Sequence, residues 1–345
     1  MTDVAVVRFA WYTVGRACTR IGREAPVRVA RDVRPNLPIA GGMVGAVLLL
    51  TGLGGVSTVR IHSPRAIVLG SDGALWFTEP ADAIGRITAE GKLRVYTHSG
   101  IYHPEGIADL PGAVWFTNLF GPSVGRITPS GVITVYHHPG IFHPEGIAAG
   151  PDGAVWFTNA DGGSAIGRIS NTGAISIYKH PGMRDPEAIT TGPDGALWFT
   201  NGGRRPSIGR ITTRGAVSLY TNPGISEPEG TVTGPDGALW FTNDNDSIGR
   251  ITTRGAVRFY SNPGIDHPWG IAVGRDGAIW FTNPVGNSIG RITPGGDITI
   301  FTHPGIRGPQ GIAPGPDGAI WFTNHYGDSI GRITMRGSVR ILRGR

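Results

Sequence analysis

Acidic and imidazole side chains recur beside one proline of a repeated sequence unit. In four consecutive copies a glutamate follows this proline: Glu105, Glu145, Glu187 and Glu229. In three copies a histidine precedes it: His103, His143 and His267. Carboxylates that converge raise one another's pKa unless a cation lies among them, and an oxygen-seeking ion such as Mg²⁺ or Ca²⁺ would relieve that repulsion. The pattern favours a cation site.

The position after the proline changes character in the other three copies. Read through all seven copies, it holds Arg65, Glu105, Glu145, Glu187, Glu229, Trp269 and Gln310. We expect these residues to bind a small ligand around a common axis, with Glu145 and Glu187 as metal ligands and Trp269 available to stack on a ring. The alternative is that carboxylates about 7–10 Å apart in solvated loops hardly interact because water and salt screen them.

These residues are positioned by a unit that occurs seven times from residue 65 onward. Its W-F-T core begins at Trp76, Trp115, Trp156, Trp198, Trp240, Trp280 and Trp321, and each core is followed by a segment reading (I/V)GRI. A period near 40 residues with several short strands in each unit is typical of propellers. The fold class predicted is all-β: a seven-bladed β-propeller of four-stranded antiparallel blades.

One unit, residues 186–222, shows how a blade is built. "PEAITTG", "ALWFTN", "SIGRIT" and "AVSLYTN" are rich in strand-forming residues and are separated by turns such as "PDG". We expect the repeated tryptophan to pack between blades and the arginine of "GRI" to pair with turn carboxylates or stack on aromatic rings. We expect the asparagine after W-F-T to form an Asx turn.

The two ends of the blades differ in variability. Turns of the "PDG" and "TRG" type hardly change, whereas the segments after W-F-T read "NLFGPS", "NADGGSA", "NGGRRPS" and "NHYGDS" in different copies. Variable loops on a uniform scaffold are where binding sites are usually built. We therefore place the functional site on the variable-loop face.

Residues 1–55 have a different composition from the repeats at 56–345. Seven arginines and only three acidic residues precede the apolar run "LPIAGGMVGAVLLLTGLGG", which has the logic of an export signal but lacks an A-x-A cleavage site. A disordered leader is the alternative. The protein would be exported or membrane-anchored if this segment acts as a signal, and cytoplasmic otherwise.

The overall charge limits the partners. The net charge is +6, of which the leader carries +4 and the repeats only +2, so we expect no nucleic-acid partner. No stable membrane insertion is expected of the propeller, which we expect to be a monomer. The single cysteine, Cys18, excludes a disulfide within one chain.

Two segments compete to close the ring. Both "SVRILR" at 338–343 and "VSTVRI" at 56–61 read as outer strands. Only three residues separate Ile61 from Arg65, which is too short a link to cross a blade from its outer to its inner strand. We predict that 338–343 forms the outer strand of the seventh blade and that 56–61 is loosely attached or paired outside it.

The amino-acid sequence of the repeated unit resembles that of one protein family. Copies such as "PEGIAAGPDGAVWFTN" followed by "IGRIS", over residues 65–345, are similar to the streptogramin B lyase (virginiamycin B lyase) family. The resemblance implies a seven-bladed propeller that confers antibiotic resistance by opening a depsipeptide ring. The reaction is an elimination at an ester that uses Mg²⁺ and a histidine base. The family's histidines follow the blade-opening prolines of the last two blades.

This chain departs from the family at those positions, which hold Trp269 and Gln310. The family's glutamate before the last of these prolines is Gly308 here, and after W-F-T of that blade come Asn324 and His325 rather than a carboxylate. The leading expectation is therefore a ligand-binding propeller.

Two alternative functions are also consistent with the sequence. The first is an active lyase whose base has moved, with the candidates His325, His267 and His143. The second is a calcium-dependent, lactonase-type hydrolase that uses Glu79 and the ring of asparagines that follow W-F-T.

Overall fold

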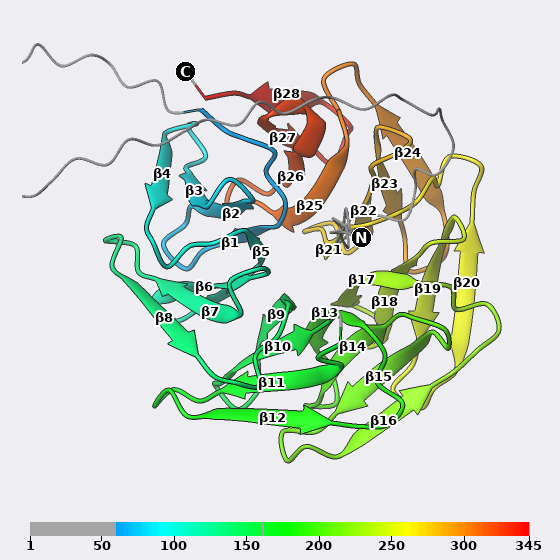
Figure 1. The fold of residues 1–345 in the computed structure, drawn as a ribbon. Coiled ribbons are helices and arrows are strands. Elements are labelled where there is room, and N and C mark those ends of the chain that lie inside the picture. The colour runs from blue at the N-terminus through cyan, green and yellow to red at the C-terminus, as the bar shows by residue number, and fades with distance from the viewer. Residues whose placement is uncertain (1–59, 161, 345) are drawn as a thin grey trace, which may run out of the picture. The chain divides into compact units, whose positions relative to one another are not determined.

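The propeller consists of seven four-stranded antiparallel blades arranged as a ring (Figure 1). The structure, a computed structural model, describes residues 60–160 and 162–344. Each blade runs from an inner strand to an outer strand in the order of the sequence. This confirms the predicted fold class. The prediction of a leader at 1–55 lies outside the described residues.

The strands of the first four blades are short and regular. Blade 1 contains β1 (Ile67–Leu69), β2 (Leu75–Glu79), β3 (Ala83–Ile87) and β4 (Leu93–Thr97). Blade 2 contains β5 (Pro104–Leu110), β6 (Ala113–Asn118), β7 (Ser123–Ile127) and β8 (Ile133–His137). Blade 3 contains β9 (Pro144–Ala149), β10 (Val155–Asn159), β11 (Ala165–Ile169) and β12 (Ile175–Lys179). Blade 4 contains β13 (Pro186–Thr191), β14 (Leu197–Asn201), β15 (Ser207–Ile211) and β16 (Val217–Tyr220).

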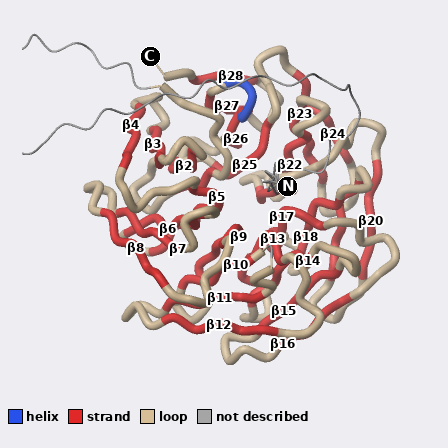
Figure 2. Tube along the Cα trace, in the orientation of Figure 1, coloured by secondary structure: helices blue, strands red, loops and turns tan. Residues whose placement is uncertain are grey.

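The last three blades follow the same plan. Blade 5 contains β17 (Pro228–Thr233), β18 (Leu239–Asn243), β19 (Ser247–Ile251) and β20 (Val257–Ser261). Blade 6 contains β21 (Ile271–Val273), β22 (Ile279–Asn283), β23 (Ser288–Ile292) and β24 (Ile298–Thr302). Blade 7 contains β25 (Pro309–Pro314), β26 (Ile320–Asn324), β27 (Ser329–Ile333) and β28 (Val339–Leu342). Within the described residues the only helix is the short η1 (His325–Gly327), between β26 and β27 (Figure 2).

The core lies between neighbouring blades. Trp76 of blade 1, for example, is fully buried and packs in a cluster with Val114, Phe116 and Ile127 of blade 2. Its ring also stacks on Tyr96 of its own blade, with 5.5 Å between ring centroids. A blade can therefore bury its faces only against its neighbours, as expected for a repeat protein. The predicted packing role of the tryptophans is confirmed.

One turn network repeats on the face opposite the variable loops. In blade 4 the carboxylate of Asp194 accepts hydrogen bonds from Trp198 Nε1 (3.0 Å) and Arg210 Nε (2.6 Å). Six blades carry this aspartate–arginine pair. In two of them the arginine also lies over the tryptophan ring. The prediction that the "GRI" arginines pair with turn carboxylates or stack on aromatic rings is confirmed for these blades.

Blade 2 is the exception because its turn is shorter. β5 pairs with β6 as far as Leu110 opposite Ala113, which leaves a two-residue turn at Pro111 and Gly112 without an aspartate. Trp115 is correspondingly the most exposed of the seven repeated tryptophans, at 7%.

The ring closes by the route expected from chain length. β28 pairs with β27, Leu342 lying opposite Ile330, which confirms the outer-strand assignment within 338–343. Residues 56–59 lie outside the described part. Ile61 is only 2% exposed and packs with Phe77 and Trp321, so it is not loosely attached. The expectation for this residue was wrong. Ile61 occupies the position that Ile101 holds in the link between blades 1 and 2, and both side chains are buried.

None of the helices in the described part of the chain is long and apolar enough to cross a membrane.

Candidate functional site

In five of the seven blades a bulge at the start of the inner strand carries the predicted site residue. In β13, Pro186 lies opposite Asn201 and Ile189 lies opposite Phe199, so one extra residue is accommodated at Glu187 and Ala188. The same register shift occurs in the inner strands of blades 2, 3, 5 and 7. A bulge re-aims side chains locally, and here it directs them to the axis.

A ring of threonine hydroxyls holds these bulges in place. Thr158 Oγ1 accepts a hydrogen bond from the N–H of Gly146 (2.8 Å) and donates one to the carbonyl of Glu187 in the next blade (2.7 Å). The threonine of W-F-T does the same in every blade, and Thr323 closes the circle by donating to the carbonyl of Arg65. Sequence reasoning missed this role, although the threonine's presence in all seven copies was the available signal.

The seven predicted ligand-binding residues line one cavity of about 260 Å³ on the axis. They are Arg65, Glu105, Glu145, Glu187, Glu229, Trp269 and Gln310. The next residues inward along the strands, including Ile67, Ile107 and Ile147, also line it. The cavity therefore has a polar, mostly acidic ring next to an apolar ring.

The four glutamates are not equivalent, contrary to the simple sequence pattern. Arg65 Nη1 forms an ion pair with Glu105 Oε2, and the side chains of both are largely buried. This arginine comes from the neighbouring blade, so one glutamate of the ring is neutralised by a specific partner. The acidic character is concentrated on Glu145, Glu187 and Glu229.

Glu145 and Glu187 form a carboxyl pair. Enclosure by the cavity wall, a hydrogen bond to Glu187 and the charges of Glu187 and Glu105 raise the pKa of Glu145 well above its usual range. Enclosure and the charges of Glu187, Asp244 and Glu227 also raise the pKa of Glu229. Two carboxyls that share a proton in a desolvated site ionise together only when a cation is supplied.

His325 and His103 lie beside the Arg65–Glu105 pair. His325 Nδ1 is 3.0 Å from the carbonyl of Ser63, so it is the protonated nitrogen and Nε2 can accept a proton. Burial and the nearby Arg65 lower the pKa of His325. The same two causes lower the pKa of His103. Both imidazoles are therefore neutral near pH 7.

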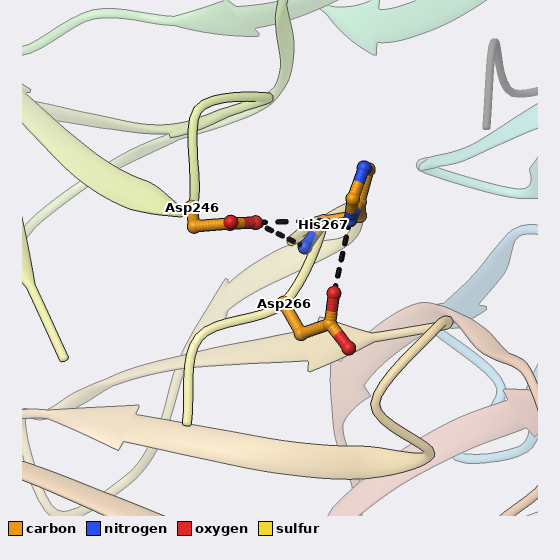
Figure 3. A group of neighbouring side chains, drawn as sticks. All are labelled: Asp246, Asp266 and His267. Atoms are coloured by element: carbon orange, nitrogen blue, oxygen red, sulfur yellow. Dashed lines mark hydrogen bonds and ion pairs between the residues drawn. The ribbon is translucent and has the colours of Figure 1, made fainter. Parts of the chain in front are cut away.

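His267 has the opposite character. Its Nδ1 lies 3.0 Å from Asp266 Oδ1, and its backbone N–H donates to Asp246 Oδ1 (2.9 Å; Figure 3). The hydrogen bond that His267 donates to Asp266, with the charges of Asp244 and Asp246, raises the pKa of His267. One potential metal-ligating atom from each of Asp246, Asp266 and His267 lies within 4.8 Å of the others. These groups already pair with one another at the surface.

The asparagines after W-F-T do not form the Asx turns that were expected. Asn118 accepts a hydrogen bond from the N–H of Tyr102 and donates to the carbonyl of Gly100, so it fastens the link that enters its own blade. All six asparagines are at most 1% exposed, and none lines the axial cavity. Glu79 takes this position in blade 1 and is equally buried. The axial cavity therefore gives no support to a lactonase-type arrangement of Glu79 with the asparagine ring.

Comparison with known proteins agrees with this architecture. The model of the virginiamycin B lyase family matches residues 56–141 and 142–343. A streptogramin B lyase structure is 32% identical, with a TM-score of 0.72, and the match covers 82% of this chain and 95% of that one. The comparison with curated proteins gives no match.

Two structures of virginiamycin B lyase from Staphylococcus aureus are also similar. One is 34% identical with a TM-score of 0.71, covering 79% of this chain and 97% of that one. The other, a catalytically inactive histidine-to-alanine variant with quinupristin, is 33% identical with a TM-score of 0.71 and covers 81% and 97%. The resemblance seen in the sequence is thus confirmed, and the chain belongs to the virginiamycin B lyase family.

Proposed function

We propose that this protein is a ligand-binding member of its family that holds a cation at Glu145 and Glu187. The cation is a divalent ion, Mg²⁺ or Ca²⁺, or the cationic group of a small ligand. The observation that carries the proposal is the hydrogen-bonded carboxyl pair in the axial cavity, with the pKa of Glu145 raised by enclosure and by its neighbours. A cation would replace the shared proton.

The donor set fits a metal that keeps part of its water shell. Mg²⁺ in proteins is commonly held by one or two carboxylates, with waters or ligand oxygens completing the octahedron. Glu145 and Glu187 supply two such carboxylates, and Glu229 adds negative potential in the same cavity. A bound metal would supply Lewis-acid polarisation of a ligand oxygen. Metal binding must also strengthen as pH rises, because the pair has to lose its proton.

The family's known chemistry is not carried over to these residues. The histidine positions implied by the resemblance hold Trp269 and Gln310, and both side chains line the cavity. Neither an indole nor a carboxamide can accept a proton near pH 7 as an imidazole does. Binding without efficient ring opening is the expected outcome.

A metal titration tests the proposal. Mg²⁺ or Ca²⁺ should raise the melting temperature of the protein, because a ligand that binds only the folded state stabilises it by mass action. In the double variant Glu145→Gln with Glu187→Gln the shift should disappear. Glu90→Gln, at an exposed glutamate outside the cavity, is the matched control and should keep it. Equal shifts in wild type and the double variant would refute the metal site.

The second candidate is a lyase with a relocated base, which the geometry of His325 favours. Its imidazole is neutral, its tautomer is fixed by the carbonyl of Ser63, and it lies near the cavity mouth at Arg65. His267 is less suited because the carboxylates around it raise its pKa and so favour its protonated form. In His325 and His267 alike, Nδ1 is occupied by a hydrogen bond, so Nε2 is the nitrogen that could act as a base.

Incubation with a group B streptogramin separates the two candidates. Ring opening by elimination leaves the mass unchanged but alters the elution time and the fragment pattern in mass spectrometry. We expect no efficient turnover. A rate of about 1 s⁻¹ or more, an ordinary enzymatic rate, that is abolished in His325→Ala would establish the lyase and its base.

A further inference from the structure

Four rings form a continuous aromatic shelf on one side of the variable-loop face. His103 lies 4.6 Å from Phe120 between ring centroids, Phe120 lies 5.8 Å from His143, and His143 lies 4.5 Å from Phe142. Phe120 and Phe142 are 44% and 47% exposed, unlike the fully buried phenylalanines of the blades. Contiguous exposed apolar surface on a protein can mark a ligand or partner contact, and two of these four rings are exposed.

The other side of the same face is acidic. Glu227, Asp244, Asp246 and Asp266 lie in the links and loops of blades 5 and 6. Their charges reach the axis, since Asp244 and Glu227 help to raise the pKa of Glu229. Arg204 and Arg205 lie in the neighbouring loop of blade 4. The face thus presents aromatic rings over blades 2 and 3 and carboxylates over blades 5 and 6.

The shelf adjoins the carboxyl pair through the chain itself. His143 directly precedes Pro144 and Glu145, so Phe142 is three residues from a member of the pair. Three residues span at most about 10 Å. One small molecule can therefore contact both features. The shelf is also uncharged at His103, because burial and the nearby Arg65 lower the pKa of this histidine.

The cavity offers a further contact for a cation with organic character. Trp269 lines the cavity together with Glu187 and Glu229. The face of an indole ring attracts ammonium groups, and such contacts gain strength when the group is desolvated. A bare metal ion would use neither this indole nor the shelf.

We propose that the ligand of this site is an aromatic amine, a small organic cation with an aryl ring within about 10 Å of its charged group. The ammonium group lies at Glu145 and Glu187, and the aryl ring packs on the shelf formed by His103, Phe120, Phe142 and His143. This inference rests on the proposed cation site. It adds the chemical class of the ligand and a second contact region.

Calorimetric or NMR titration with three probes tests the inference: 2-phenylethylamine, n-butylamine and phenylacetate. We expect 2-phenylethylamine to bind about tenfold more tightly than n-butylamine, a factor that matches one well-packed aromatic contact. Phenylacetate, which carries the ring with a negative charge, should show no binding. The ring's contribution is thereby separated from that of the charge.

Variants assign the two contributions to their residues. Phe120→Ala with Phe142→Ala should remove the tenfold preference and leave n-butylamine binding unchanged. Val132→Ala, at an exposed apolar residue in a turn of the opposite face, is the matched control and should change neither. Glu145→Gln with Glu187→Gln should abolish binding of both amines. Melting curves of each variant verify folding.

The outcomes separate this inference from the proposed cation site. Equal binding of the two amines, or a preference that survives loss of both phenylalanines, overturns the shelf and leaves the cation site standing. No binding of either amine, together with retained metal stabilisation, also overturns the aromatic amine. Failure of amines and metals alike overturns the cation site itself.

Discussion

The two faces of the propeller treat their carboxyl groups in opposite ways. On the turn face, burial would raise the pKa of Asp194, but hydrogen bonds from Trp198 and Arg210 outweigh it and hold this pKa below its usual value. On the variable-loop face, enclosure without a cation raises the pKa of Glu145 and Glu229. The first arrangement stabilises the fold with a built-in cation. In the second arrangement protonation relieves the repulsion, and the proposed cation would do the same.

The opposite pKa shifts imply opposite pH dependences of stability. A carboxyl with a lowered folded-state pKa contributes stability that is present above its unfolded pKa and lost as pH falls. A carboxyl with a raised folded-state pKa binds its proton more tightly in the folded state, so stability falls as pH rises above the unfolded value. The turn face therefore weakens in acid, and the loop face weakens toward neutral and alkaline pH.

The largest expected effect concerns Glu79, a buried carboxyl at the variable-loop end of blade 1. Burial raises the pKa of Glu79 to about 7, against an opposing hydrogen bond from the N–H of His62, and its Oε1 has no hydrogen-bond partner among the described residues. Ionisation in the unfolded state near pH 4.5 then costs folding about 3 kcal/mol by the time pH exceeds 7.

Glu79→Gln should remove that cost, because an amide keeps an acceptor for His62 and stays uncharged. We expect the free energy of unfolding to rise by about 3 kcal/mol at pH 8 relative to wild type and to change little at pH 4. Urea denaturation at the two pH values measures the difference. Asp297→Asn, at an exposed carboxyl, serves as the control. An equal effect at both pH values would mean that ionisation of Glu79 is not the cause.

Much of the fold could be predicted from the sequence because the same strand and turn pattern occurs in seven copies. Trp76 and its equivalents, the "GRI" arginines and the β28 closure could be placed from spacing, turn chemistry and chain reach. Convergence of the residues after the blade-opening prolines also followed, since inner strands surround the axis. Period and position were sufficient for these features.

The contacts that set the charge of the site residues are made between neighbouring blades. The sequence of a single repeat does not show which residues of two blades meet. The ion pair between Arg65 and Glu105 and the hydrogen bond between Glu145 and Glu187 both join different blades. The repeated Asn118 position was noticed but misassigned, because its partners lie 16 and 18 residues earlier rather than in the local turn. Regularity marked such residues as structural without naming their partners.

A second prediction concerns the ring of W-F-T threonines, which links the inner strand of each blade to that of the next. Thr158→Val keeps the shape but removes the acceptor for the N–H of Gly146 and the donor to the carbonyl of Glu187. Leaving such groups unsatisfied costs about 2 kcal/mol. We expect that loss in chemical denaturation, together with weaker metal stabilisation, because the carbonyl belongs to a residue of the carboxyl pair. Thr172→Val, on an outer turn, should leave metal stabilisation unchanged. Unaltered metal shifts in Thr158→Val would show that the ring does not position the site.

The smallest expected effect lies on the turn face. Asp194→Asn keeps the size of the side chain and an oxygen for Trp198 Nε1, but it loses the negative charge opposite Arg210. The pair is about one-fifth exposed, so solvent screens part of its attraction, and we expect a loss of about 1 kcal/mol at neutral pH. The loss should shrink in high salt and disappear as pH falls below the carboxyl's titration range, since the wild-type aspartate is then protonated as well. Metal-induced stabilisation should be unchanged, because this carboxyl lies in the turn network and not in the axial cavity. Denaturation at two salt concentrations and two pH values measures the first three expectations, and melting curves with and without Mg²⁺ measure the fourth. A change in metal stabilisation would show that the two faces are coupled, and the separation between scaffold and site would have to be abandoned.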